Sequence, residues 1–219
     1  PSVSRVGTSI GIGTFLFLLG ILIANGGYPA SADPFHTVIV RVFSQKIVPT
    51  FQPYSDYPQI YPYGFHVLAK SISSLLFFIQ DYQVLWLIGA VSLSLLPMVA
   101  GSPLAAILFL GQKVLFSDFF FGMYPELFGM FLLFSSLRLI RSKSPLWFIP
   151  WAATVAVHPT AAIIGLVLLS TQFILKKDFR SLGVLVFSPL LALPVLVVSY
   201  TSIIQNMLTH PSAEITFRS

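Results

Sequence analysis

Charge and cysteine are what this chain has least of. Only 9% of its 219 residues are charged, and it contains no cysteine. Disulfides and thiolate chemistry are therefore excluded, although this absence says nothing about the redox compartment. About 25% of the residues of a typical soluble domain are charged, so a soluble globular surface is excluded as well. With 56% hydrophobic residues and a mean hydropathy of +0.87, the chain is predicted to be an all-α, polytopic membrane protein.

The net charge of +5 comes from small basic clusters at the ends of apolar segments. Because these clusters do not form a continuous basic face, we expect no nucleic-acid binding. If the N-terminus is inside, the positive-inside rule places the following residues in the cytoplasm: Arg5, Arg138, Arg141, Lys143, Lys176, Lys177 and Arg180. The chain begins at Pro1 rather than Met and ends on a polar stretch, so we expect residues 1–219 to be an incomplete transmembrane domain.

Apolar runs indicate where the membrane helices lie, since a span needs roughly 20 residues. We predict spans over residues 9–25, 84–100, 104–121, 127–140 and 182–200. Residues 147–157 and 160–175 are two short apolar arms that meet at His158-Pro159. Residues 65–79 are too short for a span and contain Lys70, so we expect a juxtamembrane or partly inserted helix. If they did cross the membrane, every later segment would change sides.

The first loop, residues 26–64, is long and rich in proline and tyrosine. Within it, residues 34–47 have apolar side chains at helical spacing on one side and polar ones on the other, which predicts an interfacial amphipathic helix. The most distinctive segment is Tyr61-Pro62-Tyr63-Gly64-Phe65-His66, which follows Asp33-Pro34-Phe35-His36 by about thirty residues. With residues 65–79 outside the membrane core, this loop, Glu126, the His158 turn and the chain after Tyr200 are all expected on the outer side.

Asp33 is the strongest candidate for chemistry in this loop. Its carboxylate can serve as a general base or hold a metal beside a lipid headgroup. It is equally explained as a helix N-cap, because an acid followed by proline at the first helical position is a standard capping arrangement. Arg41 is placed to bind a lipid phosphate in bidentate fashion, or only to anchor the amphipathic helix.

Glu126 begins the 127–140 segment, where an acid after Pro125 also complements the helix dipole. Lys113 and Asp118 fall inside the predicted 104–121 span, and we expect each to face a polar interior. Together they could line a polar path.

The histidines add nitrogen ligands to these acids. His36, His66 and His158, with Asp33 and Glu126, could hold a divalent metal cation, but no compact ligand spacing such as HExxH is present. A metal site on Asp33, His36 and Glu126 therefore requires distant loops to converge. Otherwise His66 is an interfacial side chain, and His158 fills a helix-breaking turn.

The order of these motifs resembles the integral membrane glycosyltransferases of the GT-C superfamily. The resemblance is carried by Ser31-Ala32-Asp33-Pro34-Phe35-His36-Thr37, the segment from Tyr61 to His66, Tyr124-Pro125-Glu126 and His158-Pro159-Thr160. They are most similar to the often archaeal multispanning members. They are more distantly similar to the aminoarabinose transferase of lipid A and the protein O-mannosyltransferases. The chain departs from the usual pattern in two ways. It has a single acid where some relatives have an acid pair in the first loop, and Glu rather than Asp in the second motif, and both departures put a metal requirement in doubt.

The resemblance implies transfer of a sugar from a polyprenyl-phosphate-linked donor to an acceptor on the extracytoplasmic face. Asp33 would then be the first-loop acid and Glu126 the second. His36, Arg41, Tyr61, His66 and His158 are candidates for binding the substrate. Two other classes remain open. One is a transporter or channel with a path at Lys113 and Asp118 and a broken helix at His158-Pro159. The other is a membrane scaffold whose acids only cap helices.

Overall fold

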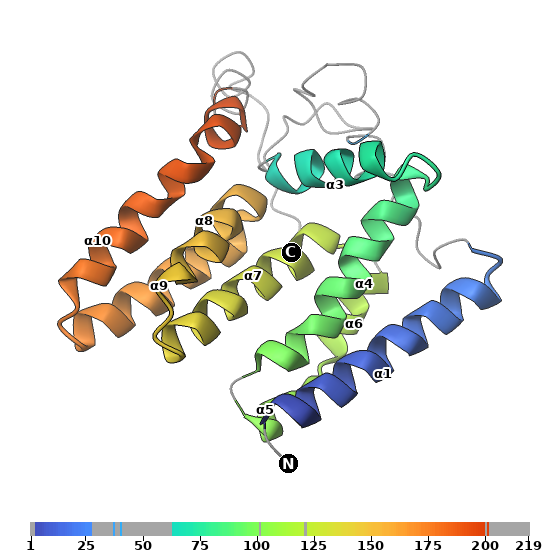
Figure 1. Cartoon of the computed structure of the whole chain (residues 1–219), viewed down its shortest axis with the longest axis horizontal. Helices are drawn as coiled ribbons and strands as arrows, with labels where there is room; N and C mark the ends of the chain where they lie inside the picture. The colour runs from blue at the N-terminus through green and yellow to red at the C-terminus, as the bar shows by residue number, and fades with distance from the viewer. Residues whose placement is uncertain are drawn as a thin grey trace, which may run out of the picture.

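The fold consists of helices and the turns that join them. The computed structural model describes residues 3–27, 37, 40, 63–100, 102–120, 122–199 and 201, and no strand occurs among them. The longer helices are α1 (Val3–Ala24), α3 (Gly64–Leu75), α4 (Asp81–Val99), α7 (Tyr124–Arg141) and α9 (Pro159–Leu175). The shorter ones are α5 (Pro103–Phe109), α6 (Lys113–Phe120), η1 (Pro145–Trp147), α8 (Phe148–Val157), α10 (Phe179–Phe187) and η2 (Ser188–Ala192). Figure 1 shows them as a bundle with α3 lying across one end.

Three helical segments are long and apolar enough to cross a membrane: Arg5–Ala24, Asp81–Val99 and Phe179–Ser199. The last of these contains α10 and η2, and it exposes most of its apolar surface, as a lipid-facing helix would. The prediction of an all-α protein with membrane-spanning helices is confirmed at this level. The first and last segments lie within a few residues of the predicted boundaries.

The prediction of one continuous helix over residues 104–121 is wrong. This segment is divided into α5 and α6, which are bent by 49° at the break between them. The amides of Leu110, Gly111 and Gln112 each bond to a carbonyl three residues earlier, as in a tightened helix end. Gly111, a weak helix former, lies at the centre of this break.

Helix α7 covers the fourth predicted span, residues 127–140, and extends it at both ends. It has 18 residues but contains Glu126, Arg138 and Arg141, so it is less apolar than the three spanning candidates. The two predicted short arms are confirmed as α8 and α9, which meet at His158.

Helix α3 is short, as expected for residues 65–79. It has 12 residues, about 18 Å of helix, and in Figure 1 it runs across the end of the bundle rather than along it. The Ser73 hydroxyl donates a hydrogen bond to the Asp81 carboxylate at the start of α4, which links the two helices across their turn. The order of sides expected for the segments after α3 stays a prediction.

Close helix contacts depend on small residues. A Cβ on Gly7 or Gly11 of α1 would collide with the backbone carbonyl oxygens of Pro97 and Ser94 in α4. This Gly-x-x-x-Gly spacing lets two helix backbones approach closely, a common device between membrane helices. A first core joins α1, α3, α4, α6 and α7, and a second joins η1, α8, α9 and α10 around Trp151. The Trp151 indole N–H donates to the Leu185 carbonyl at 2.8 Å, which fixes α10 to α8.

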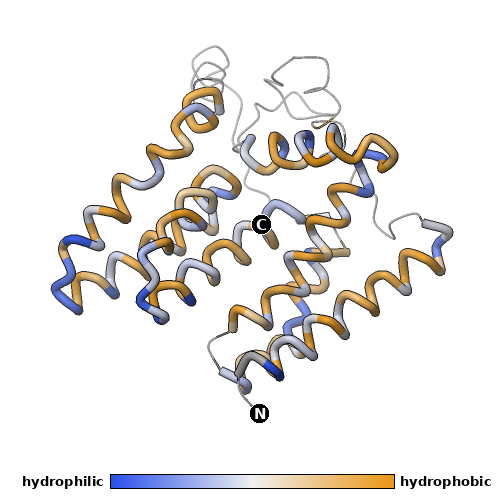
Figure 2. Tube along the Cα trace, viewed as in Figure 1, coloured by the Kyte–Doolittle hydropathy of each residue, from blue (hydrophilic) through white to orange (hydrophobic). Residues whose placement is uncertain are grey.

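Basic residues gather at one end of the bundle. The start of α1, the end of α7 and the turn between α9 and α10 lie at the end away from α3, and Figure 2 colours them as hydrophilic. These segments contain the basic residues Arg5, Arg138, Arg141, Lys176 and Lys177. We call this the basic end, and the opposite one the α3 end.

Candidate functional site

Four of the predicted site residues lie outside the described residues: Asp33, His36, Arg41 and Tyr61. Most of the predicted helix 34–47 lies outside them as well. Within it only Thr37 and Val40 are described. Both are helical, and Val40 is buried in the core that contains α1, α3 and α4.

The start of α3 is fixed against two other parts of the chain. The Tyr63 amide donates a 3.0 Å hydrogen bond to the hydroxyl of Ser199, in a buried contact. A Cβ on the next residue, Gly64, would collide with the carbonyl oxygen of Ala156 near the end of α8. Three segments that are distant in sequence therefore meet at the α3 end of the bundle.

His66 lies in the first turn of α3 and is fully buried, with 0% of its surface exposed. Its ring contacts that of Phe65 edge-on at 5.7 Å between centroids. Phe65 in turn lies 6.1 Å from Phe128 of α7. The interpretation of His66 as an interfacial side chain is therefore wrong, because the imidazole lies inside the helix packing.

His158 occupies the junction of α8 and α9. Its backbone is extended, with φ −147° and ψ 121°, because Pro159 disfavours a helical conformation in the preceding residue. Its amide bonds back to Thr154 and its carbonyl accepts from Ala162, so neither backbone group is left unsatisfied by the break. The side chain is only 6% exposed, and this burial lowers the pKa of His158 to about 4.

Glu126 lies in the first turn of α7, close to Asp118 at the end of α6. The turn between them is tight: Gly122 has a φ of 79°, and the Met123 amide donates to the Asp118 carbonyl at 2.8 Å. Asp118 lies close enough to Glu126 for the two negative charges to act on each other. Two carboxyl groups are thus held near one another where α6 turns into α7.

The start of α7 is set back from α3. Tyr124 packs against Gly89 so closely that a Cβ there would collide with its ring. Gly89 lies about 12 Å along α4 from the first residue of that helix. The start of α7, where Glu126 lies, is therefore near the middle of α4 and deeper in the bundle than α3.

Lys113 was expected to face a polar interior, because it falls within the predicted span 104–121. The structure does not place it there. The helix break places it at the first residue of α6, where its side chain is exposed. Asp118 is partly buried near the other end of the same helix. The two residues therefore differ in exposure within one short helix.

A metal centre receives no support within the part of the chain that the structure describes, where no three His, Asp or Glu side chains cluster. Of the predicted ligands Asp33, His36 and Glu126, only Glu126 belongs to that part. The metal prediction therefore remains a prediction.

Sequence reasoning missed two residues that shape this end of the bundle. Ser199 accepts the Tyr63 amide bond, and nothing in the apolar run around it signals that role. Tyr124 is 1% exposed and contacts Phe119 at 5.7 Å between ring centroids. The small residues at positions 89 and 90 of α4, Gly89 and Ala90, were the available signal for a bulky neighbour.

No protein-family model, no curated protein and no solved structure matches this chain.

Proposed function

We propose that this chain is part of a membrane glycosyltransferase of the GT-C type, which transfers a sugar from a polyprenyl-phosphate-linked donor to an acceptor at the α3 end. The observation that supports this most is the course of α3, which is short and lies across the bundle. A short α3 that does not cross the membrane would leave the first loop, the Glu126 turn and the His158 junction on one side of it. A lipid-linked donor requires such an arrangement, since its phosphate stays at the interface while its tail stays in the bilayer.

The reaction needs a base and a means of stabilising the leaving phosphate. The acceptor hydroxyl attacks the anomeric carbon, the bond from that carbon to the lipid phosphate oxygen breaks, and a carboxylate takes the hydroxyl proton. We assign the base to Asp33, and stabilisation of the charge growing on the phosphate to Arg41. Glu126 keeps its proposed role as the second acid, at the turn where α6 meets α7.

His36 and Tyr61 retain their proposed roles in contacting the donor. His66 and His158 are buried, so we propose that they hold α3 and the α8–α9 junction in place rather than touch the substrate. A divalent cation on Asp33, His36 and Glu126 is the optional part of this mechanism.

Asp33→Asn tests the assignment of the base. In membranes supplied with a labelled polyprenyl-phosphate sugar, we expect this change to abolish transfer while expression and insertion stay unchanged. Asp56→Asn is the matched control, because it removes an acid from the same loop. If Asp33→Asn keeps full transfer, or if it only lowers stability by about 1 kcal/mol as the loss of a cap would, the assignment is rejected.

A transporter is the second candidate, and the bend of 49° between α5 and α6 favours it, because transporters bind substrates at interrupted helices. The exposed position of Lys113 argues against the path first expected there. Solute flux in proteoliposomes without consumption of a lipid-linked sugar would favour the transporter.

A further inference from the structure

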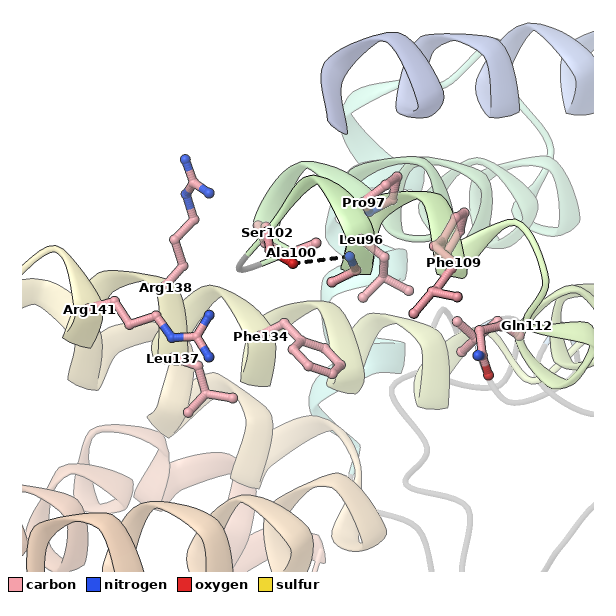
Figure 3. A pocket seen from close by; sticks show the side chains of 14 residues that line it. Leu96, Pro97, Ala100, Ser102, Phe109, Gln112, Phe134, Leu137, Arg138 and Arg141 are labelled. Atoms are coloured by element: carbon pink, nitrogen blue, oxygen red, sulfur yellow. Dashed lines mark hydrogen bonds between the residues drawn. The ribbon is translucent and has the colours of Figure 1, made fainter. Parts of the chain in front are cut away.

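A cavity lies at the basic end, between the end of α4, helix α5 and the last turns of α7. Its volume is about 670 Å³, which is within the range of sites that hold small molecules. It is separate from the candidate site, because α4 and α7 approach this cavity with their C-terminal ends. Figure 3 shows it between Leu96 and Phe109 on one side and Phe134 and Leu137 on the other.

The lining combines an apolar wall with positive charge at one edge. Most lining residues are apolar, while α7 contributes Arg138 and Arg141. No acid is among the lining residues, so nothing in the wall neutralises the two guanidinium groups. This pairing of an apolar groove with uncompensated cations fits an amphiphile with an anionic head.

The two arginines are not equivalent. Arg138 donates a 3.1 Å hydrogen bond to the carbonyl oxygen of Met98 and so helps to close the end of α4. Arg141 is exposed at the last residue of α7, and in Figure 3 its side chain lies alongside Leu137. A guanidinium has five donors in a planar fork, so Arg138 keeps donors beyond this bond and Arg141 can meet a phosphate in bidentate fashion.

Helix α5, which lines the cavity, is apolar on all sides. It buries Ala106 and Phe109 against the bundle and exposes Leu104, Ile107 and Leu108, each more than half accessible. Such a face suits contact with acyl chains. The surrounding basic end is also the end that the positive-inside rule assigns to the cytoplasm, where the leaflet surface is negative.

We propose that this cavity binds one anionic phospholipid of the cytoplasmic leaflet. Its phosphate contacts Arg141 and the remaining donors of Arg138, and an acyl chain lies along Leu96, Phe109 and Leu137. The break between α5 and α6 makes room for this chain, because Gln112 at the break is part of the lining. The bound lipid fills a space that would otherwise leave α5 poorly supported against α4 and α7.

Native mass spectrometry of the purified protein tests the proposal, with phosphatidylglycerol and phosphatidylcholine of the same acyl chains as the two probes. We expect the protein to retain one phosphatidylglycerol in preference to phosphatidylcholine, and Arg141→Gln to weaken that retention about fivefold. Arg180→Gln is the matched control, because it removes the same charge at the same end, outside the cavity. It should retain phosphatidylglycerol as the unchanged protein does.

A second variant separates the groove from the charges. Ala105 lines the cavity and is exposed, so Ala105→Phe should occupy the groove, leave both arginines in place and also reduce retention. Glycerol phosphate, the headgroup without its chains, should not displace the lipid. Equal retention of both lipids, an equal effect of Arg180→Gln and Arg141→Gln, or displacement by glycerol phosphate would each overturn the proposal.

Discussion

At His158 the local sequence sets the backbone conformation, and the surrounding helices bury the side chain. Pro159 requires an extended backbone before it, which ends α8 and begins α9. The same break turns the imidazole into the helix packing, where a Cβ on Gly129 would lie 2.9 Å from the His158 Cβ. Because the buried ring resists protonation, His158 is neutral at neutral pH.

This burial predicts a loss of stability in mild acid. The pKa of His158 is about 4 in the folded protein and about 6.5 when it is exposed on unfolding. As the pH falls below 6.5 the unfolded state takes up a proton that the folded state does not, so the free energy of unfolding decreases. The loss grows to roughly 3 kcal/mol near pH 4.

Thermal unfolding of the protein in detergent between pH 7 and pH 4.5 measures this loss. His158→Gln removes the titrating group, so the variant should lose less stability over that range than the unchanged protein. Parallel pH profiles for the two proteins would show that His158 is not responsible.

Gly129 supports the same junction from α7. A Cβ there would meet two fixed Cβ atoms, those of His158 at 2.9 Å and Ala161 at 3.2 Å, which cannot rotate away. Gly129→Ala should therefore separate α7 from α9 and lower the free energy of unfolding by about 1–3 kcal/mol.

Gly13→Ala is the control for this change, since nothing lies within 4 Å of the added methyl group on α1. It should be neutral or stabilise by up to about 1 kcal/mol, through helix propensity alone. Denaturant titration of the two variants compares the effects, and equal stability would contradict the packing argument.

At the scale of elements, the lengths of the apolar runs predicted the helices well, but they did not predict every break between helices. The run at 65–79 was correctly expected to be short, because length alone excludes a span. The break at Gly111 was missed, although Gln112 and Lys113 follow it, because apolar residues resume at Val114 and a single glycine is tolerated in many helices. The His158 break was predicted, because proline restricts the residue before it whatever the tertiary context.

The sequence predicted the candidate site only in part. Glu126 was expected at a helix start and is found there, since Pro125 marks such positions. The nearness of Asp118, by contrast, depends on the tight turn at Gly122, which joins two helices that the hydropathy pattern shows only as separate runs. The burial of His66 depends on tertiary packing that a local pattern does not contain.

The contact between α1 and α4 gives an element-scale prediction. Gly11→Leu would force a side chain against the Ser94 carbonyl, a backbone atom that cannot yield, so α1 should separate from α4. Gly20→Leu, on the same helix with open space around it, should have little effect. The concentration of sodium dodecyl sulfate at half unfolding is the readout, and a lower value for Gly11→Leu alone is expected.

At the scale of the whole molecule, the fold separates two kinds of surface along the bundle. The turn from α3 to α4 and the end of α1 lie together, because Gln83 near the start of α4 reaches the Gly27 carbonyl at 3.4 Å. The opposite end collects the basic turns, and Arg138 links α7 to the end of α4 there. The proposed sugar transfer and the proposed lipid site require these ends to face opposite sides of the membrane.

Single cysteines test this sidedness directly, because the chain has no cysteine of its own and any labelled thiol is the introduced one. Asn25→Cys and Phe77→Cys lie at the α3 end, while Ser142→Cys and Lys176→Cys lie at the basic end, and all four positions are exposed. In intact cells we expect a membrane-impermeant maleimide to label the first pair, and to label the second pair only after permeabilisation, since basic turns remain in the cytoplasm. Labelling of Asn25→Cys and Phe77→Cys from different sides would mean that the segment between them crosses the membrane once more or once less than the fold requires. The first loop and Glu126 would then no longer share a side, and the glycosyltransferase proposal would fail with that result.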